Sequence, residues 1–192
     1  MTLHFQKELE RIKKMILSLG ALVEERLRMS VKAIEDNDMD LARTIVDKDF
    51  EVDQMEVDIE EECLKVLALY QPVAVDLRFL VAVIKINNDL ERIGDQAVNI
   101  AQRIQSIAKR KKPETFVFDY TEMAEKVQQM LKMSLDSLVN MDDKTANRVR
   151  QMDDEVDDLQ REAYGRMKRA MKVNSDHITY LVNLFLISRH LE

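Results

Sequence analysis

The chain has 192 residues and a formal net charge of −7, and it contains only three glycines and two prolines. Sheets, barrels and α/β folds need turns or glycine loops far more often than so few residues allow, which excludes these fold classes. The acidic balance argues against nucleic-acid binding, which needs a basic face, and the single cysteine excludes internal disulfides and thiolate zinc clusters.

The first half of the chain predicts three long helices. Apolar residues recur at three- and four-residue steps from the start. Asp38 can cap a second helix, and Pro72 ends it because the residue before a proline is pushed out of the helical region. The third helix begins with the stretch 73–86, which is apolar on nearly every side and is expected to be the most buried piece of the first bundle. The three expected helices span residues 5–36, 39–70 and 73–109.

The second half predicts three more helices after an expected linker at 112–119. They are expected at 121–141, at 144–172 and from 176 to the end of the sequence. A polar turn at 173–175 caps the last of them.

The two halves repeat each other. Shifted by 104 positions, Asp49, Glu51, Val52 and Asp53 meet Asp153, Glu155, Val156 and Asp157 without a gap. At an offset of 101, Leu80, Val81, Ile86, Leu90 and Glu91 meet Leu181, Val182, Ile187, Leu191 and Glu192. A shared heptad pattern would align the apolar positions but not the aspartates. We therefore predict an all-α fold of two tandem three-helix bundles related by internal duplication, with a first repeat at 1–111, a linker at 112–119 and a C-terminally incomplete second repeat at 120–192.

Acidic residues line up at the margin of the predicted core. Asp49 and Asp53 share one strip of the second helix with Glu56 and Glu60, about a quarter turn from its apolar row. On the third helix, Glu91, Asp95 and Asn99 form a second column. Two carboxylates about 4 Å apart repel by roughly 4 kcal/mol at an effective dielectric of 20, so such columns need a cation, a proton or wide spacing. Oxygen-only ligands suit hard cations such as Mg²⁺, Ca²⁺, Mn²⁺ or oxidised iron.

Two segments are far more specific than a heptad pattern: Gln71 to Arg78 (QPVAVDLR) and Asp89 to Ala101 (DLERIGDQAVNIA). They resemble the PhoU family of bacterial phosphate-transport regulators, which are built from two three-helix repeats, and the resemblance covers essentially the whole chain. It implies that acidic-x-x-x-Asp motifs on the second and third helix of each repeat face each other. Such pairs would hold a multinuclear cluster of iron or zinc, or of another hard divalent ion.

The same resemblance implies which residues form the two metal sites. The first would consist of Asp49, Asp53, Glu91 and Asp95, with Asn99 in a supporting role. The second would begin with Asp153, Asp157 and Glu192, and it lacks its fourth acid and its asparagine.

The function implied by the resemblance is that of a non-enzymatic negative regulator of phosphate uptake and phosphate-starvation signalling. Its implied partners are the ATPase subunit of a phosphate ABC transporter and a phosphate sensor histidine kinase, and it would act as a homodimer. The polar first residues and the lack of a long apolar stretch lead us to expect a cytoplasmic protein that is peripheral to the membrane at most.

Two alternatives stay open at this point. One is a carboxylate-ligated di-metal hydrolase or oxidase. The Glu-x-x-His motif of di-iron bundles is absent at His4, His177 and His190, but a hydrolytic site on oxygen ligands alone is not excluded. The other alternative is a metal-free coiled-coil scaffold, which would bind no metal and would be insensitive to chelators.

Overall fold

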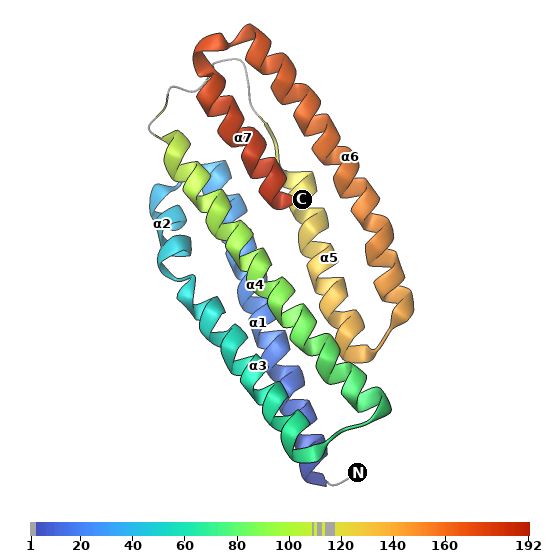
Figure 1. Cartoon of the computed structure of the whole chain (residues 1–192). Helices are drawn as coiled ribbons and strands as arrows, with labels where there is room; N and C mark the ends of the chain where they lie inside the picture. Colours follow the sequence, from blue (N-terminus) through green and yellow to red (C-terminus); the bar gives the residue numbers. More distant parts are fainter. Residues whose placement is uncertain (1–2, 109, 111–112, 114–117) are drawn as a thin grey trace.

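The computed structural model describes residues 3–108, 110, 113 and 118–192, and it is all-α, with no strand in those residues (Figure 1). The helices are α1 (Leu3–Asp36), α2 (Met39–Asp47), α3 (Phe50–Tyr70), α4 (Ala74–Ala108), α5 (Thr121–Asn140), α6 (Asp143–Val173) and α7 (Ile178–Leu191), and a short 3₁₀ turn, η1 (Ser175–His177), precedes α7. The predicted fold class is confirmed. The expected linker lies largely outside the described residues, so the repeat boundaries stay predictions.

Aspartates cap corresponding helices in the two halves. The Oδ1 atom of Asp38 accepts hydrogen bonds from the backbone N–H groups of Asp40 and Leu41, at 3.0 and 2.9 Å, at the start of α2. Asp142 caps α6 in the same way. These two caps are related by the same 104-residue shift as the aspartates of the repeat, as a duplicated unit requires.

The helix expected at 39–70 is interrupted, so the prediction of one continuous helix is wrong. It ends as α2 at Asp47 and resumes as α3 at Phe50, with a tight turn at Lys48 and Asp49 between them. The counterpart in the second half, α6, runs unbroken from Asp143 to Val173. The turn contains neither glycine nor proline, so no local signal marks it, and the chain changes direction between α2 and α3 (Figure 1).

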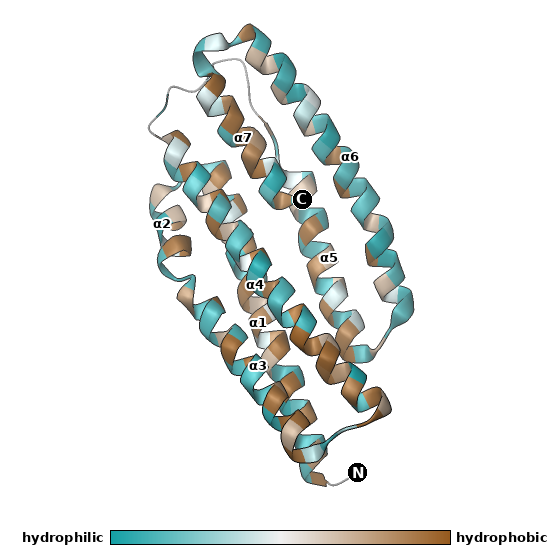
Figure 2. Ribbon diagram, in the orientation of Figure 1, coloured by the Kyte–Doolittle hydropathy of each residue, from teal (hydrophilic) through white to brown (hydrophobic). Residues whose placement is uncertain are grey.

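The apolar residues form two cores, one at each end of the elongated molecule. One core joins the first half of α1, α3, the first half of α4 and the second half of α5. The other joins the end of α1 and the second half of α4 to α2, α6 and α7 and the start of α5. Each core draws on both repeats, so the two copies are fused along α1, α4 and α5 (Figures 1 and 2). No helix in the described part of the chain is long and apolar enough to cross a bilayer.

The stretch 73–86 is only half buried, so the prediction that it is the most buried piece is wrong. Leu80 and Val83 are fully buried, whereas Val73 and Val75 are 74% and 57% exposed. The physical reason is the position of α4. Its first turns extend past the α5–α6 pair, so only the side that faces α1 and α3 is covered (Figure 1).

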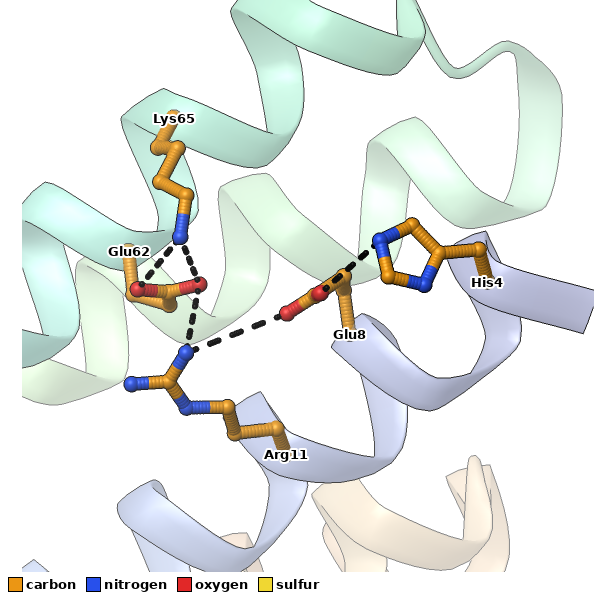
Figure 3. Close-up of polar contacts among 5 residues, drawn as sticks. All are labelled: His4, Glu8, Arg11, Glu62 and Lys65. Atoms are coloured by element: carbon orange, nitrogen blue, oxygen red, sulfur yellow. Dashed lines mark hydrogen bonds and ion pairs between the residues drawn. The ribbon is translucent and has the colours of Figure 1, made fainter.

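An ion-pair network fixes the rotation of α3 against α1 (Figure 3). The buried Glu62 of α3 accepts hydrogen bonds from Arg11 Nη1 of α1, at 3.3 Å, and from Lys65 Nζ, at 3.0 Å. Arg11 also lies 4.0 Å from Glu8, which in turn lies 3.8 Å from His4. Because Glu62 can make these contacts only from the α1 side, the opposite side of α3 is held toward solvent.

Candidate functional site

A close approach of α3 and α4 builds the candidate site. A Cβ atom added to Gly94 would lie 3.1 Å from Cγ1 of Val52, so the absence of a side chain at Gly94 lets the helices pack this closely. Farther along the pair, Asn87 donates a hydrogen bond from Nδ2 to the backbone carbonyl of Glu56, at 2.8 Å. These two contacts set the spacing and the register of α3 against α4.

The four acids predicted for the first site surround this approach. Asp49 and Asp53 flank Val52 in sequence, and Glu91 and Asp95 flank Gly94. Because α3 and α4 are antiparallel neighbours (Figure 1), the two pairs face each other across the contact. The structure therefore brings together the acids that the sequence assigns to one site.

Burial and mutual repulsion raise the pKa values of two of these acids, Asp49 and Glu91. Burial raises the pKa of Asp49 most, and the charges of Asp53 and Asp95 raise it further. Burial is also the largest cause of the raised pKa of Glu91, followed by repulsion from Asp95 and Asp53. The carboxylates of the two helices therefore act on one another through a shared negative electrostatic field. This field disfavours the ionised forms of Asp49 and Glu91.

Glu56 belongs to the same field, although it is not among the predicted ligands. Its pKa is raised by burial and then by Glu60 and Asp53, and its charge in turn raises the pKa of Glu91. The sequence places Glu56 on the acidic strip of α3, and that strip is the signal from which its membership could be inferred. Asn99, which is half-buried, lies one turn beyond Asp95 on α4.

Arg26 of α1 is the residue that the sequence analysis missed. Its side chain is only 5% exposed and donates a hydrogen bond to Glu51 of α3. The Arg26 charge also lowers the pKa of Asp49, against the causes that raise it. The available signal was a lone arginine beside Val23 and Leu27 on the buried side of α1. At the equivalent position in the second copy stands Met130, and Glu155, which corresponds to Glu51, pairs with Lys126.

The donor chemistry of the first cluster fits a hard cation, because every candidate ligand offers oxygen. In the described ranges, however, no three His, Cys, Asp or Glu side chains are placed so that they could enclose one ion. The acids are thus close enough to repel one another, but their side chains do not surround a common point as the ligands of one ion would. A metal would need carboxylates to turn toward it, and the metal cluster stays a prediction.

The acids predicted for the second site have different neighbours. Asp157 lies 3.9 Å from Arg161, and Glu192 lies 2.8 Å from Arg189, each pair within one helix or at its end. Asp153 is exposed on α6. Arginines therefore offset two of these three charges locally, and the second metal site also stays a prediction.

The raised pKa values predict how stability depends on pH. A carboxyl group with a higher pKa in the folded state binds more protons there than when unfolded, so it destabilises the fold as pH rises through that window. The window starts at the ordinary values, 3.8 for Asp49 and 4.5 for Glu91, and extends upward to their raised folded values. We expect Asp95→Asn, which removes a repelling neighbour of both groups, to raise the melting temperature of the metal-free protein at pH 7 more than at pH 4.

The measurement is the melting temperature of both proteins across this pH range. Asp158→Asn is the matched control, because it removes one charge from an exposed position on α6. If Asp95→Asn raises the melting temperature by the same amount at pH 4 and pH 7, the acids do not repel one another as proposed.

Comparison with known proteins identifies the family. The PhoU domain model matches residues 16–104 and 120–192, which supports the tandem duplication. A PhoU homolog from Aquifex aeolicus, named a phosphate-specific transport system accessory protein, is 33% identical over 97% of this chain and 84% of its own length. A Synechocystis homolog of the same name is 35% identical, over 98% of this chain and 84% of its own length.

Solved structures agree with the sequence matches. The crystal structure of PhoU from Pseudomonas aeruginosa superposes with a TM-score of 0.90 at 33% identity, covering 97% of this chain and 90% of that one. The PhoU structure from Streptococcus pneumoniae gives a TM-score of 0.84 at 27% identity, over 98% and 88%. With both repeats matched and the fold shared over nearly its full length, the chain belongs to the PhoU family.

Proposed function

We propose that this chain is a non-enzymatic cytoplasmic regulator of phosphate uptake, which damps phosphate-starvation signalling when phosphate is plentiful. Its proposed partners are the ATPase subunit of a phosphate ABC transporter and a sensor histidine kinase, and it works as a homodimer. The observation that carries the proposal is the match to both repeats by proteins named phosphate-specific transport system accessory proteins. The word accessory favours a regulatory role over a catalytic one.

The test is a gene deletion in the source cell, with a phosphate-starvation reporter read in phosphate-rich medium. We expect the reporter to be active in the deletion strain and silent again when the gene is restored. A reporter that stays silent without the gene would overturn the proposal.

We further propose that the acids on α3 and α4 bind iron, zinc or another hard divalent ion. Asp49, Asp53, Glu91 and Asp95 would hold it, with Asn99 in support, and Asp153, Asp157 and Glu192 would contribute to a second site. A bound cation would supply positive charge that offsets the repulsion among the carboxylates and links the two helices. The support is the shared field of the first cluster, in which burial and like charges raise the pKa values of Asp49 and Glu91.

Metal removal tests the first site. We expect the purified protein to carry metal by elemental analysis, and to melt at a lower temperature after chelation, because ligand binding to the native state alone adds to its stability. Asp53→Asn combined with Asp95→Asn should abolish both effects. The control is Asp58→Asn with Asp89→Asn, which removes the same charge from the same two helices at exposed positions. Equal metal content in the two double variants would contradict the assigned ligands.

A further inference from the structure

The helix α3 carries a second apolar row on the side opposite its core. Phe50, Val57 and Leu64 follow one another at intervals of seven residues and are 64%, 44% and 52% exposed. Seven residues make almost two full turns of an α-helix, so the three side chains form one line, which we call the α3 ridge. The buried row of α3, which includes Val52, Ile59 and Cys63, lies roughly half a turn away.

The α3 ridge faces away from the rest of the molecule. The helices packed against α3 are α1 and α4, and α3 lies along the outer edge of the first repeat, far from α6 (Figure 1). The contacts of Glu62 with α1 hold this orientation (Figure 3). Single exposed apolar residues are ordinary on protein surfaces. A straight row at heptad spacing differs, because it repeats one of the two positions per heptad by which one helix packs along another. The second position, three residues farther on, holds the acids Asp53 and Glu60.

The negative charge of α3 determines what kind of partner helix could bind along the ridge. The sequence of α3 contains seven acidic residues and one lysine. Glu60 is exposed on one side of the ridge, and Glu61 is exposed on its other side. Two copies packed ridge against ridge would bring these carboxylates into opposition, and like-charge contacts across an interface cost several kcal/mol. Lysines or arginines flanking the apolar row of a partner would instead be attracted.

We propose that the α3 ridge is a docking surface for a basic amphipathic helix of another protein. The partner helix would present apolar side chains at heptad spacing to Phe50, Val57 and Leu64. Its cationic residues would lie against the acids beside the ridge. This inference does not depend on the proposed role in phosphate uptake, since its test requires neither a transporter nor a kinase.

The test uses a labelled synthetic helix of about three heptads, with leucines on one face and lysines beside them. A second peptide carries glutamate in place of every lysine. Fluorescence anisotropy at physiological salt measures the binding of each peptide to the full chain. We expect the lysine peptide to bind and the glutamate peptide not to bind.

The decisive variant is the triple substitution Phe50→Ser, Val57→Ser and Leu64→Ser, which keeps the net charge. We expect it to weaken binding of the lysine peptide at least about tenfold, because apolar contacts near the centre of an interface carry most of the affinity. The matched control is Leu17→Ser with Val182→Ser, which removes apolar side chains that are each 38% exposed on other helices. Its affinity should equal that of the unaltered protein.

Each other result counts against the proposal. Undiminished binding by the ridge variant would mean that charge alone attracts the peptide. Equal binding of the glutamate peptide would refute the charge argument, and so would failure of the unaltered protein to bind the lysine peptide. If light scattering shows that the chain self-associates and that the ridge variant does not, the occupant is a second copy.

Discussion

Replacing Arg26 by glutamate is expected to lower the free energy of unfolding by about 3–5 kcal/mol, the usual cost of leaving a buried charge without its partner. The side chain at this position is only 5% exposed and donates to Glu51. A carboxylate there would face Glu51 and lie within the field of Asp49, whose pKa the arginine now lowers. The substitution therefore converts an attractive contact of Glu51, which also lies 4.0 Å from Lys48, into a buried repulsion.

Chemical denaturation at pH 7 measures the loss, and Arg26→Met is the control. Methionine occupies the equivalent position, 130, in the second copy, so it suits a helix of this kind. We expect Arg26→Met to cost only about 1 kcal/mol, because Glu51 is 37% exposed and can turn toward water. If glutamate costs no more than methionine, Arg26 does not act through its charge.

Much of this structure could be predicted from the residue pattern. Heptad spacing, Asp38 and Pro72 placed the helix ends to within a few residues, because caps and prolines act locally. The position of Asp49 and Asp53 at the margin of the core also followed from spacing, whereas their pairing with Glu91 and Asp95 was implied by the resemblance to the PhoU family. Acids beside the buried row of one helix must lie near the next helix in the bundle.

The features that escaped prediction depend on contacts between distant segments. The turn at Lys48 and Asp49 has no glycine or proline to mark it, and the burial of Arg26 depends on its meeting Glu51 from another helix. Val73 and Val75 are likewise exposed because α5 and α6 do not extend far enough to cover them. The sequence around the two valines gives no indication of this. Periodicity shows which faces are apolar, but tertiary packing decides which of those faces are covered.

Replacing Gly94 by valine is expected to cost about 2 kcal/mol of stability and to loosen the acidic cluster. A Cβ atom at this position already lies 3.1 Å from Val52 Cγ1, and Val52 is buried and has a branched, stiff side chain. The additional methyl groups of valine must push α3 and α4 apart, and overpacking of this kind typically costs about 1–3 kcal/mol. Gly94→Ala should show a smaller effect of the same kind.

Two measurements distinguish this packing effect from a simple change in helix propensity. Gly165→Ala is the control. Among the residues that the structure describes, a Cβ there meets only Arg169 Nη1, at 3.6 Å, and the loss of a helical glycine should stabilise by about 0.5–1 kcal/mol. The second measurement is the pH dependence of the melting temperature of the metal-free protein. If Gly94 holds the two acidic columns together, Gly94→Val must weaken the repulsion between them, so that stability falls less steeply toward pH 7. A variant that lost stability and kept the original pH dependence would show that the acids do not depend on this approach of α3 and α4.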